Sequence, residues 1–152
     1  MESELLLDAK TALIKGEVQK SLEMFDKVLE EEPENQIALF SRGTARFREQ
    51  DFKGAIEDFD RYIALNPSNE KIYCSRGNAY LSLNNLDQAM EDLDRAIRIN
   101  PQYPTAYFSR SEVFKQLGEE EHAAADWETA EKLQRQISQA YFESQGIMYQ
   151  NF

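Results

Sequence analysis

The chain contains one histidine, His122, and one cysteine, Cys74, so few side chains are available for chemistry. A single histidine excludes catalytic triads and multi-histidine metal sites, and a single cysteine excludes an internal disulfide. The sequence also lacks a glycine-rich phosphate-binding loop. These observations predict a protein that is not an enzyme and that carries no cofactor and no metal ion.

An acidic segment around His122 is the strongest candidate for a metal site. Residues 119–121 are all glutamate, and Asp126 follows the histidine by one helical turn. Carboxylates and imidazole together are able to hold a metal ion weakly. The helix dipole also favours acidic residues in the first turn of a helix. We therefore interpret this segment as a helix start.

Cys74 is the other reactive group. A nucleophilic thiol requires a basic neighbour, and Lys71 lies three residues before it. A small, apolar lining role for Cys74 is the simpler interpretation.

Arginines and aspartates form a second pattern, in which each arginine is followed by an aspartate at a constant separation. The three pairs are Arg42 with Asp58, Arg76 with Asp92, and Arg110 with Asp126. Both members are missing together from the start of the chain, where Asp8 and Met24 occupy the matching positions. Because the planar guanidinium binds carboxylates with specific geometry, the pattern predicts ion pairs between helices. Independent surface charges, which contribute little to stability, are the alternative.

The pairs recur because the whole chain is built from repeats of constant length. Residues 36–69 and 70–103 align without a gap and share 12 identities. One step backward and one step forward give residues 2–35 and 104–137. Such a period indicates stacked units that cannot bury their apolar faces alone. We predict a single domain of four repeats over residues 2–137.

Each repeat contains two segments with apolar residues at the three- and four-residue spacing of an α-helix. The turns between them carry Gly16-Glu17, Gln50-Asp51, Asn84-Asn85 and Gly118-Glu119. Glycine and asparagine tolerate a left-handed helix cap, and the residue after them acts as or near an N-cap. Gln50 departs from this rule, which predicts strain or a different turn there.

Proline residues end the second helix of the first three repeats, because the residue before proline avoids helical geometry. The fourth repeat has Arg135 in place of this proline. Its second helix is therefore expected to continue to about Ser144 and to end at Gly146.

One position of the second helices is occupied in turn by Phe25, Phe59, Leu93 and Trp127. Small residues at matching positions of the helices, such as Gly43, indicate close helix packing around these large groups. We predict that Trp127 is buried, so that its replacement by alanine costs roughly 3–5 kcal/mol.

The net charge of the chain is −11, and it is unevenly spread. Residues 1–35 alone carry four basic and ten acidic side chains. An acidic chain without a basic stripe repels phosphate backbones, so nucleic acid is excluded as a partner. The sequence has no continuous apolar run long enough to span a bilayer, which argues against membrane insertion. The acidic N-terminus does not read as a secretory signal, and a cytoplasmic location is expected.

The repeat pattern resembles the tetratricopeptide repeat (TPR) family in its period, in a small residue early in each repeat, in an alanine near the twentieth place and in a proline near the end. The resemblance implies an all-α fold, a right-handed α-solenoid of four helix-turn-helix pairs with a C-terminal helical extension. Arg46 and Tyr62 depart from the pattern, because the family has apolar and small residues there. The carboxylate clamp that one branch of the family uses for heat-shock chaperone tails is matched by Lys71 alone.

The resemblance also implies a concave groove, lined by the first helix of each pair, that binds a peptide or helix of a partner protein. The residues expected there are Phe40, Ser41, Thr44, Phe47, Lys71, Cys74, Ser75, Asn78, Leu81, Thr105, Phe108, Ser109 and Glu112. This apolar and weakly polar mixture suits a segment with apolar side chains. A packing role of Phe40 and Phe108 between adjacent helices is the alternative.

Residues 138–152 form a C-terminal extension that is rich in aromatic and apolar residues. Such a segment caps the last helix pair, docks in a groove, or joins a partner, which includes a homo-oligomer formed through the tail. We expect capping by residues 135–145. The chain is predicted to act as a scaffold or adaptor, and a dedicated assembly factor or chaperone for a secreted or membrane-complex subunit is the alternative function.

Overall fold

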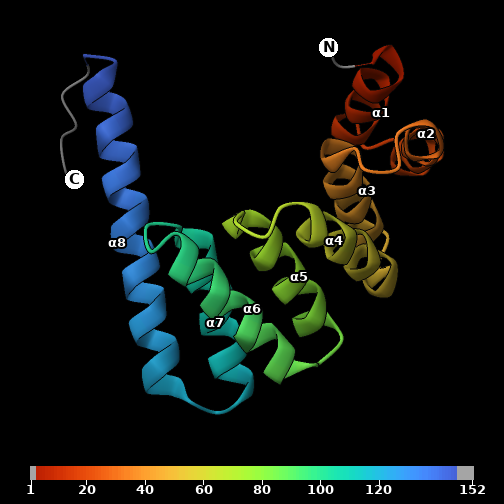
Figure 1. Cartoon of the computed structure of the whole chain (residues 1–152). Helices are drawn as coiled ribbons and strands as arrows, with labels where there is room; N and C mark the ends of the chain where they lie inside the picture. The colour runs from red at the N-terminus through yellow and green to blue at the C-terminus, as the bar shows by residue number, and fades with distance from the viewer. Residues whose placement is uncertain (1–2, 147–152) are drawn as a thin grey trace.

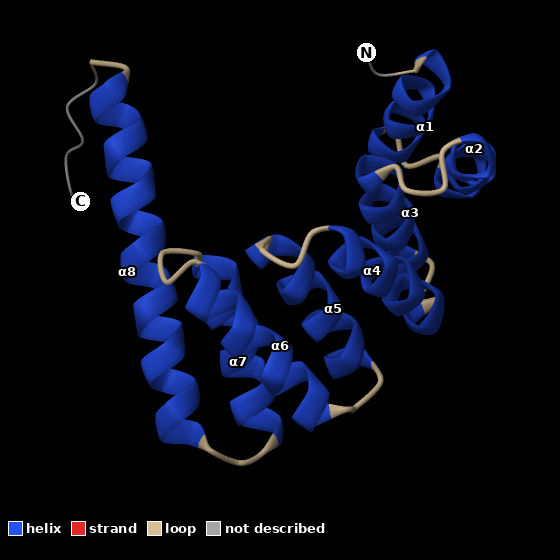
Figure 2. Ribbon diagram, viewed as in Figure 1, coloured by secondary structure: helices blue, strands red, loops and turns tan. Residues whose placement is uncertain are grey.

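The structure is a computed structural model that describes residues 3–146. Its eight helices are α1 (Glu4–Ile14), α2 (Val18–Glu31), α3 (Gln36–Arg48), α4 (Phe52–Leu65), α5 (Glu70–Ser82), α6 (Leu86–Ile99), α7 (Pro104–Gln116) and α8 (Glu120–Ser144). Consecutive helices pair, and the pairs stack in chain order (Figure 1). No strand occurs within residues 3–146 (Figure 2). The predicted all-α fold with four helix pairs is confirmed.

The last helix is longer than the others, as the missing proline predicts. α8 has 25 residues, it ends at Ser144, and Gly146 adopts a left-handed conformation with a φ of 71°. Its second half stands clear of α7 (Figure 1). Residues 135–144 therefore continue the axis of α8 and leave Tyr141 62% exposed. The predicted roles of Ile147 to Phe152 lie outside the described residues.

The four turns within the helix pairs share one backbone geometry. Their left-handed residues are Gly16, Gln50, Asn84 and Gly118, with φ angles of 80°, 62°, 58° and 75°. Each is followed by the N-cap residue of the next helix, as predicted. The second pair thus uses the same turn as the others, and Gln50 bears the strain of a non-glycine residue at positive φ.

Replacement of Gln50 by glycine is expected to raise the free energy of unfolding by about 1 kcal/mol, because glycine adopts this conformation without steric cost. Asn84→Gly is the matched control, since asparagine tolerates the left-handed region better than glutamine. Urea unfolding followed by circular dichroism measures both. An equal gain in the two variants would contradict a specific strain at Gln50.

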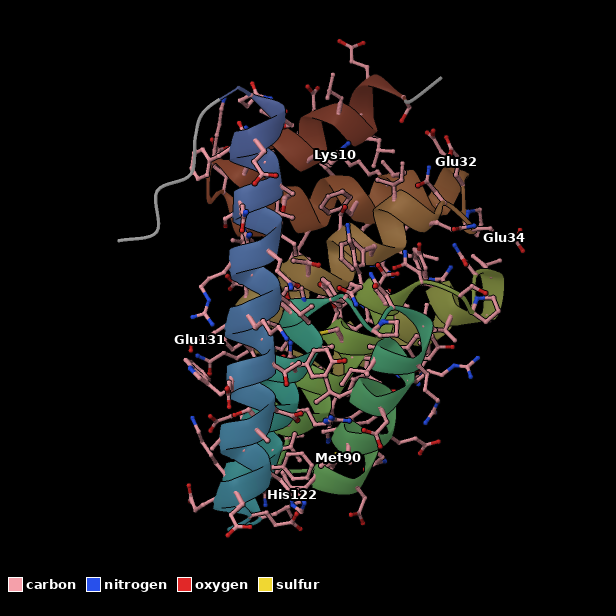
Figure 3. All side chains as sticks on the ribbon, turned by 90° about the vertical axis from the view of Figure 1, so that its left-hand side faces the viewer. Lys10, Glu32, Glu34, Met90, His122 and Glu131 are labelled. Carbon is pink, nitrogen blue, oxygen red and sulfur yellow. The ribbon has the colours of Figure 1, made fainter. Side chains whose placement is uncertain are left out.

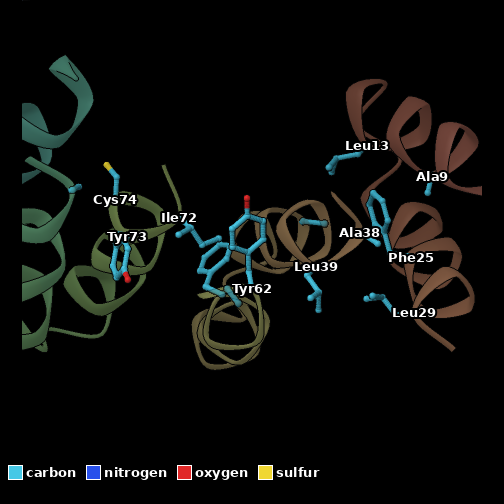
Figure 4. Packing of buried hydrophobic residues seen from close by; sticks show 14 of the residues in the cluster. Ala9, Leu13, Phe25, Leu29, Ala38, Leu39, Tyr62, Ile72, Tyr73 and Cys74 are labelled. Atoms are coloured by element: carbon cyan, nitrogen blue, oxygen red, sulfur yellow. The ribbon is translucent and has the colours of Figure 1, made fainter. Parts of the chain in front are cut away.

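The core lies between successive helices, both within the helix pairs and at the junctions between repeats. Phe25, Phe59 and Leu93 of the second helices are fully buried. Figure 4 shows Phe25 and Leu29 of α2 facing Ala38 and Leu39 of α3. Contact is so close that a Cβ atom added to Gly43 would lie 2.5 Å from the Phe59 ring.

The prediction that Trp127 is buried is wrong. Trp127 is 46% exposed, although it occupies the same repeat position as Phe59. Its ring packs at 4.8 Å from the Phe108 ring, and the Lys115 ammonium lies 5.1 Å from its centroid. The equivalent aromatic residues are covered by the first helix of the following repeat, and no described helix follows α8.

The predicted arginine–aspartate pairs are all present, each with two hydrogen bonds. In the third repeat, Nε and Nη2 of Arg76 donate to the carboxylate of Asp92 at 2.8 and 2.7 Å. Arg42 with Asp58 and Arg110 with Asp126 repeat this geometry. Burial raises the pKa of the Asp92 carboxyl above its ordinary value, and Arg76 opposes that rise.

Each of these arginines also binds the repeat before its own, a contact that sequence reasoning missed. Nη1 of Arg42, Arg76 and Arg110 donates at 2.8 Å to Asp26, Asp60 and Asp94, respectively. These aspartates recur at the repeat period, and this recurrence could have indicated the contact from the sequence. Because one guanidinium bridges two second helices, the pairs fix how one repeat is placed on the next.

Candidate partner-binding surface

Two small cavities open on the surface formed by α3 and α5. The first cavity has a volume of about 100 Å³ and is lined by Thr44, Phe47, Phe59, Ser75 and Asn78. Its walls combine two aromatic rings with hydroxyl and amide groups. Such a cavity accommodates a small apolar group and offers hydrogen bonds at its rim.

The second cavity lies toward the N-terminal ends of the same two helices and has a volume of about 280 Å³. It is lined by Gln36, Ile37, Phe40, Tyr62, Asn69 and Lys71. The Phe40 and Tyr62 rings contact each other edge to face, with centroids 6.3 Å apart. Lys71 is exposed, so this cavity joins an apolar wall to one positive charge.

Sequence reasoning missed Phe59 and Tyr62 because it considered the first helix of each pair alone. Both belong to α4, the second helix of the pair; Phe59 lines the first cavity and Tyr62 lines the second. Tyr62 stands where the family pattern has a small residue, and its hydroxyl accepts a hydrogen bond from Asn69 at 2.8 Å. That departure was the signal that could have identified it. Ile37 was also missed, although it occupies the repeat position of Lys71.

The remaining predicted groove residues line neither cavity. Thr105 and Glu112 are exposed, while Ser41, Leu81, Phe108 and Ser109 are half-buried. The structure therefore groups Phe40, Thr44, Phe47, Lys71, Ser75 and Asn78 around the two cavities and leaves the α7 residues apart from them. Phe108 instead packs against Trp127.

Arg46, the other departure from the family pattern, has a structural role. Its Nη1 donates to the Gly54 carbonyl at 3.2 Å and to Asp58 at 3.1 Å. Asp58 therefore binds two arginines, Arg42 and Arg46, within the second repeat.

Cys74 is buried between α5 and α7 and does not offer a nucleophile. Its Sγ lies 3.8 Å from Oγ of Ser109 and 3.9 Å from Nδ2 of Asn78. Burial raises the pKa of the thiol to about 11. The thiolate is the reactive form of cysteine, so the folded chain holds Cys74 in its unreactive state.

A thiol reagent such as DTNB is expected to label Cys74 at least tenfold more slowly in buffer at pH 7.5 than in denaturing urea. The reason is that both access to Sγ and the thiolate fraction are low in the folded chain. Absorbance at the released thionitrobenzoate band measures the rate. Equal rates in the two solvents would contradict the burial of this residue.

The acidic segment at the start of α8 is a helix N-terminus, as interpreted from the sequence. Glu119 is the N-cap residue, and its Oε2 lies 2.7 Å from Nδ1 of His122. Within residues 3–146, no three histidine, cysteine, aspartate or glutamate residues are grouped so that they could hold a metal ion. None of the helices in this range has the length and apolarity needed to cross a bilayer.

Two family models match the sequence. One, described as "Tetratricopeptide repeat", matches residues 6–70, and the other, described as "TPR repeat", matches residues 77–118. Together they cover parts of all four helix pairs. No curated protein matches the chain in sequence.

Solved structures with the same fold are numerous. MamA from Desulfovibrio magneticus RS-1 has a TM-score of 0.81 and 20% identity, over 87% of this chain and 75% of that chain. Another MamA crystal structure has a TM-score of 0.77 and 23% identity, over 93% and 81% of the two chains. A thermophilic TPR protein from Thermus thermophilus has a TM-score of 0.76 and 25% identity, over 85% and 72%.

Proposed function

Because the chain belongs to the tetratricopeptide repeat family, whose domains bind protein partners, we propose that it is a non-catalytic scaffold whose α3–α5 surface binds a segment of a partner protein. The observation that carries this proposal is the pair of cavities, each apolar at its wall and polar at its rim. Apolar anchors set among small polar groups are the usual means by which a groove holds a peptide.

The residues that line the second cavity indicate which side chains of a partner segment it would bind. Ile37, Phe40 and Tyr62 form an apolar wall for an aliphatic or aromatic side chain. Lys71 at the edge favours a carboxylate next to that side chain. The first cavity, with its smaller volume, accepts a shorter apolar side chain from the same segment. A free thiol in the core suits a reducing compartment, and we propose a cytoplasmic location.

Two variants test the site by affinity purification from native lysate, read by mass spectrometry. Ile37→Gln alters the second cavity, and Leu7→Gln on α1 is the matched control, because the two side chains are 49% and 54% exposed. Proteins that the wild type and Leu7→Gln retain, and Ile37→Gln loses, are the expected result. The same proteins are then tested with Lys71→Gln, which removes the charge alone.

Circular dichroism and melting confirm that the variants are folded before they are compared. If the recovered proteins remain bound to both Ile37→Gln and Lys71→Gln as tightly as to the wild type, the α3–α5 surface is not the binding site.

A further inference from the structure

The two ends of the repeat stack carry different residues. The three junctions between repeats within residues 3–146 show which residues normally meet there, so each end can be compared with them. At each junction an arginine of one first helix donates a hydrogen bond to an aspartate of the preceding second helix, and the residue before that aspartate is a large, buried apolar one. The large residues are Phe25, Phe59 and Leu93; the aspartates are Asp26, Asp60 and Asp94; the arginines are Arg42, Arg76 and Arg110.

Small or aliphatic residues flank each arginine on the face that meets the preceding repeat. Four residues before it lie Ala38, Ile72 and Ala106, and three residues after it lie Ala45, Ala79 and Val113; all six are fully buried. A helix that joins this stack therefore carries a small or aliphatic residue, an arginine four positions later, and another small or aliphatic residue three positions after that.

The C-terminal end of the stack presents the first half of this junction without the second. Trp127 occupies the position of Phe59 and is 46% exposed, and Glu128 occupies the position of Asp60. Glu128 is exposed, and within residues 3–146 it has no hydrogen-bond or ion-pair partner. Glu131 occupies the repeat position of Leu29, Ile63 and Ile97 and points away from the bundle (Figure 3). This replacement makes the C-terminal end of the stack more acidic.

The N-terminal end cannot supply the missing half. On α1, Glu4, Asp8 and Thr11 occupy the positions of Ala38, Arg42 and Ala45, and all three are exposed. If a second copy stacked head to tail, Asp8 would face Glu128, and two carboxylates in that geometry repel each other. Residues 147–152 contain no basic side chain and cannot supply the arginine either.

We propose that the end face formed by Trp127, Glu128 and Glu131 of α8 is a second interaction surface, which receives a basic helix of a partner protein. The helix places small residues over Trp127 and donates from an arginine to Glu128, as Arg42 donates to Asp26. This surface is distinct from the α3–α5 cavities, so its test is independent of the proposed function.

The full chain itself provides the first test. The variant Glu4→Ala, Asp8→Arg, Thr11→Ala gives α1 the residues that the other first helices present to a preceding repeat. It is expected to associate head to tail as its concentration rises, and Trp127, the only tryptophan, is expected to shift its emission to shorter wavelength as it becomes buried. Adding Glu128→Arg to this variant is expected to weaken the association at least tenfold, because it removes one hydrogen bond between charged groups.

A synthetic peptide of residues 35–49 provides the second test and does not depend on the folding of a variant. It contains α3 with its N-cap Asn35 and carries Ala38, Arg42 and Ala45, but neither tyrosine nor tryptophan. Titration into the wild-type chain is expected to shift Trp127 emission. The Arg42→Gln peptide is expected to bind at least tenfold more weakly. The Arg42→Glu peptide is expected to recover affinity with a Glu128→Arg chain.

Unchanged Trp127 emission with the peptide, together with a triple variant that keeps the sedimentation coefficient of the wild type, would overturn the proposal. Association or peptide binding that Glu128→Arg leaves unaltered would overturn it as well. Ile37→Gln, the variant of the α3–α5 surface, is expected to leave both measurements unchanged.

Discussion

Replacement of Arg76 by methionine is expected to lower the free energy of unfolding by about 3–5 kcal/mol, because it leaves the buried Asp92 carboxylate without its partner. The guanidinium of Arg76 also binds Asp60 and lies 5.8 and 5.9 Å from the rings of Tyr73 and Tyr80. Methionine retains part of the aliphatic packing but none of these interactions. Urea unfolding followed by circular dichroism measures the loss.

A double-mutant cycle separates the ion pair from the rest. The variant Arg76→Met with Asp92→Leu removes both charges, and it is expected to be clearly more stable than the sum of the single losses predicts, since no buried charge remains unpaired. Arg98→Met on the same stack is the control, because Arg98 is exposed; a change within about 0.5 kcal/mol, the size usual for a surface position, is expected there. Additive losses in the cycle would show that Arg76 and Asp92 act independently.

Phe59→Ala and Trp127→Ala are expected to differ strongly although the two residues occupy the same repeat position. Phe59 is fully buried between α3, α4 and α5, so its truncation leaves a cavity and costs about 3–5 kcal/mol. Trp127 is half exposed at the end of the stack, and its truncation is expected to cost about 1–2 kcal/mol. Thermal and urea unfolding of the two variants give the comparison.

The difference is specific to the end of the stack. Phe25→Ala in the first junction is the control, because Phe25 is also fully buried, and it is expected to resemble Phe59→Ala. A Trp127→Ala variant as destabilised as these two would mean that the end of α8 is covered in solution. Analytical ultracentrifugation of the wild-type chain would then show whether a second copy covers this face.

The repeat period and the turn residues predicted most of the fold. Residues such as Gly118 and Pro67 act through local backbone preferences, so the sequence alone indicates where helices begin and end. The arginine–aspartate pairs were also predictable, because Arg76 and Asp92 recur at a fixed separation and disappear together from the first repeat. Their second contact, from Arg76 to Asp60, joins different repeats and was missed.

The candidate surface was predicted less well. Of the residues predicted from the first helices, Phe40, Phe47 and Lys71 line the two cavities. Phe59 and Tyr62 were absent from that prediction because they reach the cavities from the second helix, and the direction of a side chain across a helix pair depends on how the pair packs.

The sequence by itself determined the number of helix pairs, where the helices begin and end, and the arginine–aspartate pairs within the repeats. These features depend on local backbone conformation and on a repeat that occurs four times in the sequence. Only the tertiary structure decided which copies of a repeated position are buried. Phe59 and Trp127 are equivalent in sequence, yet one is enclosed and the other is half exposed. The physical reason is that burial requires a neighbour, and the last repeat of a stack has a neighbour on one side only.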